Sequence, residues 1–228
     1  MKSSLRLLAA LTCCCGHLAA AQGLGADSDV ADAGDCEIET AFQRTKARNE
    51  PVQREAAVRV ACGVGWRTEL EATLARVRAG RASERLLSLQ AKTTLHDRGD
   101  DGIGWALALG IDAERPAGSG WRRSTERIEL EASRQFGPAW LAEARLGTER
   151  DRATRRHSTT WALAVERAWS ETVEINAELS GDDRSKPFVG FGWRYALWRD
   201  DVQVKLSWAA RTGTPREQQM AVSLQYEF

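Results

Sequence analysis

Two cysteines and a large set of charged side chains are the residues of this sequence that could do chemistry. Cys36 and Cys62 are the only cysteines after residue 21. Their separation does not fit the C-x-x-C spacing of a redox site, so a structural disulfide is the chemistry open to them. The alternative is a pair of free thiols.

Charged side chains follow a period of two along much of the chain. The carboxylates at these positions are Glu37, Glu39, Glu55, Glu69, Glu71, Glu129, Glu131, Glu143, Glu166, Glu174 and Glu178. The cations are Arg59, Arg67, Lys92, Arg127, Arg145, Arg194, Lys205 and Arg211. A period of two places all of them on one face of extended strands, on which carboxylates outnumber cations.

Positions of the opposite parity carry mainly apolar side chains, which predicts strands with one apolar and one polar face. About twelve such stretches are separated by short turn-like segments: residues 36–43, 55–62, 66–74, 87–94, 103–111, 127–133, 140–149, 161–166, 173–179, 189–197, 202–208 and 217–228. No run of about 18 apolar residues follows the N-terminal region, so a helical membrane span is excluded. The mean hydropathy of −0.44 still fits strands that bury one face in lipid and the other in a polar interior.

The first two stretches are predicted to form a hairpin. If its turn is centred on Asn49, Cys36 faces Cys62 across the two strands. Directly opposed strand residues have a Cα spacing that a disulfide can span. We therefore predict a Cys36–Cys62 disulfide, formed in an oxidising compartment.

The last strand ends on an aromatic residue at the carboxyl terminus. Its apolar row is Met220, Val222, Leu224, Tyr226 and Phe228. This ending resembles the closing strand of bacterial outer-membrane β-barrel proteins, a family that includes porins; no narrower subfamily is indicated. The resemblance implies that Tyr226 and Phe228 form the signal read by the barrel assembly machinery, with periplasmic chaperones as further partners during biogenesis.

We therefore predict one all-β domain over residues 35–228, a closed antiparallel transmembrane β-barrel of about twelve strands. Its expected location is the outer membrane of a Gram-negative bacterium, with outer-membrane lipid as its surroundings. The architectural alternative is a barrel of ten strands preceded by a helical hairpin over residues 35–62. Pro51 counts against one continuous helix there but not against two helices. The oligomeric state is left open.

The N-terminal region has the features of a secretory signal peptide. Lys2 and Arg6 precede the apolar run 7–11, and Ala19-Ala20-Ala21 offers a cleavage site before Gln22. We predict a signal peptide over residues 1–21, export through the Sec pathway, and a flexible periplasmic lead-in over residues 22–34. A lipoprotein is the alternative, because Cys13, Cys14 and Cys15 lie nearby, but Thr12 is a poor residue before a lipidated cysteine.

Tryptophans gather at one set of predicted strand ends. Those at the expected periplasmic ends are Trp66, Trp105, Trp140, Trp169 and Trp198, together with Tyr226 and Phe228. Aromatic residues at strand ends form girdles at the membrane interface, so we predict such a girdle here. The alternative is a set of ordinary core aromatics.

The inward-facing charges carry the functional prediction. The residues proposed to line the lumen are Glu69, Glu71, Glu129, Glu131, Glu143, Arg67, Arg127, Arg145, Arg194 and Lys205. One interpretation is a narrow pore for small hydrophilic solutes that prefers cations, because carboxylates are in excess. The other is a closed structural barrel filled by salt bridges. Inward glycines and alanines, such as Gly104 to Gly110, could leave space or accept long side chains from other strands.

An enzyme is the remaining alternative, since outer-membrane barrels include lipid hydrolases that use a Ser nucleophile and a His base. His157-Ser158-Thr159 is similar in spacing to the His-x-Ser arrangement of lipid A deacylases. However, Thr159 stands at the nucleophile position and Ser158 would point to the other face of a strand. We therefore predict no catalytic residues, no cofactor and no metal site. A slight acidic excess after removal of Lys2 and Arg6 argues against a nucleic-acid partner.

Overall fold

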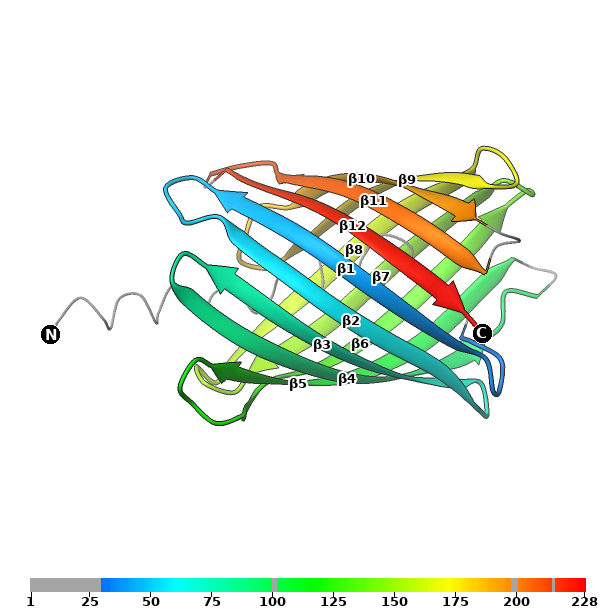
Figure 1. Cartoon of the computed structure of the whole chain (residues 1–228). Helices are drawn as coiled ribbons and strands as arrows, with labels where there is room; N and C mark the ends of the chain where they lie inside the picture. Colours follow the sequence, from blue (N-terminus) through cyan, green and yellow to red (C-terminus); the bar gives the residue numbers. More distant parts are fainter. Residues whose placement is uncertain (1–29, 100–101, 198–200, 215) are drawn as a thin grey trace, which may run out of the picture.

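A computed structural model describes residues 30–99, 102–197, 201–214 and 216–228, which form a closed antiparallel β-barrel (Figure 1). The predicted signal peptide, most of the predicted lead-in and Trp198 lie outside the described residues. The strands cross the barrel wall at a steep inclination to its axis (Figure 1), as closure of a sheet into a barrel requires. No helix in the described part of the chain is long and apolar enough to cross a membrane.

The barrel has the twelve strands predicted from the alternation of side chains. They are β1 (Cys36–Ala47), β2 (Gln53–Gly65), β3 (Thr68–Ala79), β4 (Ala82–His96), β5 (Ile103–Pro116), β6 (Arg122–Phe136), β7 (Trp140–Asp151), β8 (Arg156–Ala168), β9 (Val173–Asp182), β10 (Phe188–Leu197), β11 (Val202–Arg211) and β12 (Glu217–Glu227). Their lengths of 10 to 15 residues are enough for tilted strands that span a bilayer, which need about 9 to 11 residues.

The period of two separates an apolar outer face from a polar inner face. In β3, Leu70 and Leu74 are 49% and 53% exposed on the outside, whereas Thr73 and Ala75 are each 2% exposed. Large apolar side chains are exposed in this way on every strand, so the molecule is inside out relative to a soluble protein. Such an exterior suits lipid, and the polar residues are enclosed within the wall.

The first hairpin has the predicted register. Cys36 pairs with Cys62, Ile38 with Val60 and Thr40 with Val58. A disulfide joins Cys36 and Cys62, whose Cα atoms are 4.2 Å apart. Residues 36–47 and 53–65 are thus strands, and the ten-strand alternative with an N-terminal helical hairpin is wrong. The physical reason is that their period is two rather than 3.6, so only a strand gives them one apolar face.

Pairing of β1 with β12 closes the barrel. The register places Ile38 opposite Tyr226 and Phe42 opposite Val222. The last residue takes part in this seam through its backbone: Cys36 N donates to Phe228 O at 2.9 Å, and Phe228 N donates to Cys36 O at 2.8 Å. The rings of Tyr226 and Phe228 stack on the outer face with centroids 5.7 Å apart. The carboxyl-terminal residue therefore completes the hydrogen bonding of the sheet.

We call the end of the barrel at which β1 begins and β12 ends the terminal end. The opposite end, at which β1 is connected to β2, is the distal end. All the connections are short, as predicted. One correction concerns the connection of β2 to β3, where Trp66 and Arg67 form the turn with φ values of 51° and 57° and do not begin a strand. An irregularity between Gly63 and Gly65 prolongs β2 and leaves only these two residues to reverse the chain.

The described tryptophans of the predicted girdle all lie near the terminal end. Trp105, Trp140 and Trp169 are 40%, 43% and 65% exposed, and Trp66 is 93% exposed in its turn. The guanidinium of Arg167 lies over the rings of Trp140 and Trp169, 5.0 Å and 4.9 Å from their centroids. These rings are on the outer surface rather than in a core. Their role as a membrane girdle stays a prediction.

We predict that deletion of Phe228 reduces assembly of the barrel more than Phe228→Ala does. The deletion removes both backbone hydrogen bonds to Cys36, whereas the alanine variant removes only the ring. The measurement is heat-modifiable gel migration of the protein in isolated outer membranes. Normal assembly of the shortened chain would contradict this role of the seam.

Candidate functional site: the charged lumen

A cavity of about 750 Å³ occupies the lumen. Twelve carboxylate side chains line it: Asp35, Glu37, Glu39, Glu55, Glu69, Glu71, Glu129, Glu131, Glu166, Glu174, Asp201 and Glu227. Six cationic side chains do so: Arg59, Lys92, Arg127, Arg145, Arg194 and Lys205. The wall of this cavity is therefore acidic, although the whole chain has no net charge.

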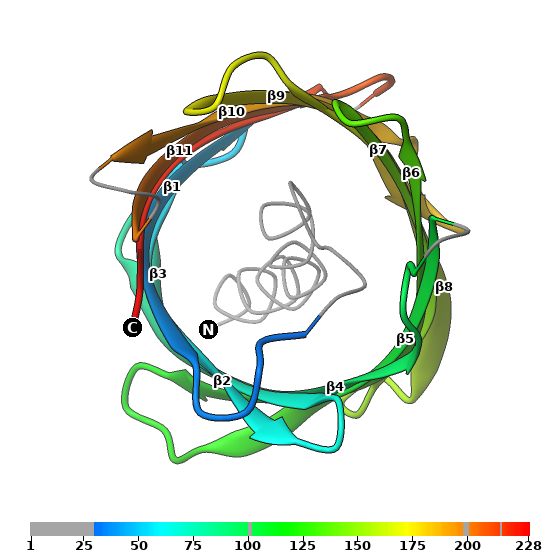
Figure 2. The ribbon, with the colours of Figure 1, turned by 90° about the vertical axis from the view of Figure 1, so that its right-hand side faces the viewer.

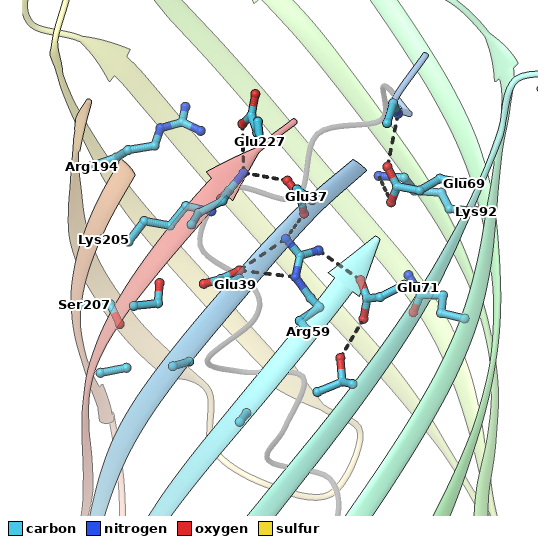
Figure 3. Close-up of a pocket in the computed structure, with 18 of the residues that line it drawn as sticks. Glu37, Glu39, Arg59, Glu69, Glu71, Lys92, Arg194, Lys205, Ser207 and Glu227 are labelled. Carbon is cyan, nitrogen blue, oxygen red and sulfur yellow. Dashed lines mark hydrogen bonds and ion pairs between the residues drawn. The ribbon is translucent and has the colours of Figure 1, made fainter. Parts of the chain in front are cut away.

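Arg59 is the centre of the largest charge cluster (Figure 3). It extends from β2 and contacts a carboxylate on either side, because Glu39 faces it on β1 and Glu71 lies on β3. Its guanidinium is 3.2 Å from Glu39 and 3.0 Å from Glu71, and it also forms an ion pair with Glu37. Gln225 Nε2 donates to Glu37 at 2.5 Å and so connects the cluster to β12. One cation thus holds together carboxylates on the two strands that flank β2.

Arg127 is the centre of a second cluster. Its Nη1 donates to Asp112 at 3.0 Å, and its Nη2 donates to Ser88 at 2.9 Å and to Gln90 at 3.1 Å. The side chain reaches these strands by crossing Gly110, where a Cβ would lie 2.5 Å from Arg127 Nε. At this point the row of small inward residues accepts a long side chain instead of leaving open space.

The remaining lumen cations also approach carboxylates. Arg194 pairs with Glu174 and lies 3.8 Å from Glu166. Arg145 is 3.9 Å from Glu178, and Lys92 is 3.9 Å from Glu69. Figure 3 shows Lys205 directed toward Glu37 and Glu39. Each cation therefore has an acidic neighbour.

Some lumen carboxylates have no such neighbour. Glu55 and Glu129 line the cavity and make no hydrogen bond or ion pair with another residue of the described ranges. The lumen cations are engaged with other carboxylates, so these two carboxyl groups have no cationic partner.

The structure places most of the predicted lumen residues inside the barrel. Glu69, Glu71, Glu129, Glu131, Arg127, Arg145, Arg194 and Lys205 line the cavity. Glu143 is 7% exposed and lies on the inner parity of β7. The prediction for Arg67 is wrong, because this residue lies in the β2–β3 turn and pairs with Asp97. Asp112 and Gln225 were not among the predicted site residues, although their inner parity could have indicated them.

A short segment before β1, residues 30–35, narrows the mouth of the lumen at the terminal end. Figure 2 shows this segment turning from the barrel wall toward the interior. Gly34 N donates to Gly63 O and Gly63 N donates to Asp35 O, each at 3.0 Å, and Ala31 N donates to Glu69 at 3.1 Å. A Cβ on Gly63 would lie 2.1 Å from Asp32 O, so only glycine permits this close contact. The end of the predicted lead-in is thus held against β2 and β3.

The other candidate chemistry is not assembled in the lumen. His157 and Thr159 are exposed on the outer parity of β8, near the distal end. Thr159 N donates to Asp183 at 3.1 Å, which fixes the chain locally. In the described part of the chain, no three His, Cys, Asp or Glu side chains are arranged to hold a metal ion.

Solved structures of similar fold are outer-membrane proteins. KdgM porin aligns with a TM-score of 0.60 at 9% identity, covering 83% of this chain and 99% of that one. An outer membrane channel from Pseudomonas putida F1 gives 0.61 at 9% identity, covering 90% and 99%. NanC porin gives 0.59 at 8% identity, covering 82% and 98%. At this identity the likeness establishes the fold: the chain is an outer-membrane-type β-barrel.

Sequence comparison gives one further match. A family model described as "Uncharacterised conserved protein UCP029691" matches residues 7–199. No curated protein matches the sequence. The solved structures named above are porins and a channel rather than enzymes.

We predict that Arg59→Gln lowers the free energy of unfolding by about 1–3 kcal/mol, because it leaves enclosed carboxylates without their partner. Urea unfolding of the protein in lipid vesicles, followed by tryptophan fluorescence, measures this change. Arg81→Gln, at the exposed β3–β4 turn, is the control and should change stability by at most about 0.5 kcal/mol. Equal stability of the two variants would contradict the role given to Arg59.

Proposed function

We propose that this chain, which belongs to the family of uncharacterised conserved proteins matched above, is a narrow, cation-preferring pore for small hydrophilic solutes. The observation that supports this proposal is the cavity of about 750 Å³ whose wall carries twelve carboxylates against six cations. Fixed carboxylates raise the local concentration of cations and lower that of anions.

The wall chemistry also bears on the class of solute. A second KdgM structure is in complex with disordered oligogalacturonate, a chain of sugars that carry carboxylates. A polyanion of this kind would meet repulsion from Glu55 and Glu129, which have no cationic partner. Small cations or neutral hydrophilic molecules fit this lumen better than acidic oligosaccharides do.

A closed structural barrel is the second candidate. The clusters around Arg59 and Arg127 and the segment at the terminal mouth support it, because each of them places protein atoms inside the barrel. These groups narrow the lumen, so the pore is proposed for small solutes only. A lipid hydrolase is not proposed, since His157 and Thr159 lie on the outer face at a strand end.

The proposed setting is the outer membrane of a Gram-negative bacterium, reached through the Sec pathway after cleavage near Gln22. The barrel assembly machinery and periplasmic chaperones are proposed as partners during biogenesis. Twelve strands place both barrel termini on one side, which is the periplasmic side in bacterial barrels of this kind. The distal end then faces the exterior.

We predict discrete conductance steps when the purified protein is inserted into planar lipid bilayers. Under a KCl gradient, the reversal potential should show preference for K⁺, because the wall is acidic. Glu55→Gln with Glu129→Gln should shift the ratio of K⁺ to Cl⁻ permeability toward 1, whereas Glu171→Gln, in the exposed β8–β9 connection, should leave it unchanged. Absence of any conductance step would favour the closed barrel, and preference for Cl⁻ would contradict the selectivity.

A further inference from the structure

The outside of the distal end carries arginines that face one another across neighbouring strands. In one row Arg44 on β1 pairs with Arg54 on β2, and Arg54 pairs with Arg78 on β3. In a second row Arg76 on β3 pairs with Arg85 on β4, and Arg85 pairs with Arg115 on β5. The six arginines that form this arginine belt are Arg44, Arg54, Arg76, Arg78, Arg85 and Arg115, and all six are exposed. Like charges directly opposite one another destabilise a sheet.

The protein does not compensate these charges. No member of the arginine belt forms an ion pair with another residue of the described ranges; Arg76 Nε donates to Ser83 Oγ at 3.4 Å, and Arg115 Nε donates to Ser119 O at 3.1 Å. Other basic residues at the same end behave differently. Arg122 lies 2.5 Å from Glu114, and Arg123 lies 2.5 Å from Glu126. The belt is therefore a group of adjacent exposed cations without an acidic partner in the described part of the chain.

The belt borders the apolar band of the outer wall. Arg44 follows Phe42 on the outer parity of β1, and Arg76 follows Leu74 on that of β3; the two apolar side chains are 62% and 53% exposed. An arginine next to a lipid-facing residue extends its charge toward the headgroup layer. A polyanion dissolved in water would meet the rim of the barrel first, whereas a lipid headgroup meets the wall at this level. The position therefore favours a lipid.

The belt lies on β1 to β5; beyond it, the outer Arg150 of β7 stands between Glu126 of β6 and His157 of β8 rather than beside other arginines. The corresponding outer positions near the distal end of β9 to β12 are Gly181, Val189, Ala210 and Gln218. A general attraction to a charged surface would not require this asymmetry. A patch that is two rows deep and spans five strands offers instead several guanidinium groups to one headgroup. Guanidinium binds phosphate oxygens in bidentate fashion, which suits phosphate better than an isolated carboxylate would.

From these observations we infer that the arginine belt is a binding site for a membrane lipid whose headgroup carries phosphates, in the leaflet around the distal end. The inference rests on the membrane setting of the proposed function but not on an open pore. The phosphates reduce the repulsion between the opposed guanidinium groups, and the acyl chains of the lipid lie against the adjacent apolar band. The bound lipid thus supplies the anionic partner for the belt arginines.

The test uses the purified full chain in detergent, with lipid A carrying two phosphates as the probe and its phosphate-free form as the comparison. Native mass spectrometry measures how much of each lipid stays bound. We expect the phosphorylated lipid to be retained and the phosphate-free lipid to be lost. The combined variant Arg54→Gln, Arg78→Gln and Arg85→Gln should bind phosphorylated lipid at least about tenfold more weakly.

The matched control removes the same charge from the distal end outside the belt, by Arg155→Gln, Arg156→Gln and Arg216→Gln, and should stay within about twofold of the original protein. Equal retention of the two lipids would overturn the inference, as would equal weakening in both variants or binding of soluble polyphosphate in preference to lipid. Heat-modifiable migration verifies folding. Lipid retention by a protein without conductance would count against the pore alone.

Discussion

The hydrogen-bonded seam between β1 and β12 is the contact on which the rest of the structure depends. A twelve-stranded sheet without it has two unpaired edges and no inside. With it, every backbone group of the wall can be paired within the sheet, which a lipid environment demands because it supplies no hydrogen bonds. The reciprocal hydrogen bonds between Cys36 and Phe228 extend the seam to the last residue. The Cys36–Cys62 disulfide fastens β2 to β1 at the same end.

Closure also decides where charge can be placed. Inside, Arg59, Arg127 and Arg194 each hold carboxylates from other strands, and the acidic groups left over set the character of the cavity. Outside, the wall is apolar through its middle, and the belt arginines begin where the apolar band ends. The excess of carboxylates thus lies inside the wall, whereas the belt arginines lie outside it. The uneven distribution creates local fields even though the whole chain has no net charge.

The sequence predicted the barrel well because its principal signal is local. A period of two identifies strands, and the positions of Cys36 and Cys62 determine the register of the first hairpin. Trp66 and Arg67 were assigned to a strand because a bulge near Gly63 has no sequence pattern of its own; their positive φ values become evident only in the turn.

The partners of Arg127 could not be predicted from the sequence, for another reason. Whether it crosses Gly110 to meet Asp112 depends on the registers of several strands together, and a list of inward residues does not contain that information. The segment at the terminal mouth lacks any periodicity.

The alternation of side chains also protects the register of the barrel against error. In the proposed membrane setting, sliding one strand past its neighbours by a single residue would expose its inward charges to lipid. A misplaced arginine near the middle of a bilayer costs about 2 to 4 kcal/mol. A slip of β2 would bring Arg59 outward, and a slip of β3 would bring Glu69 and Glu71 outward. Such a penalty exists only in the bilayer, since water or detergent headgroups would solvate the misplaced charges. The bilayer thus destabilises misregistered strand pairings whose backbone hydrogen bonds would be as good as those of the native register.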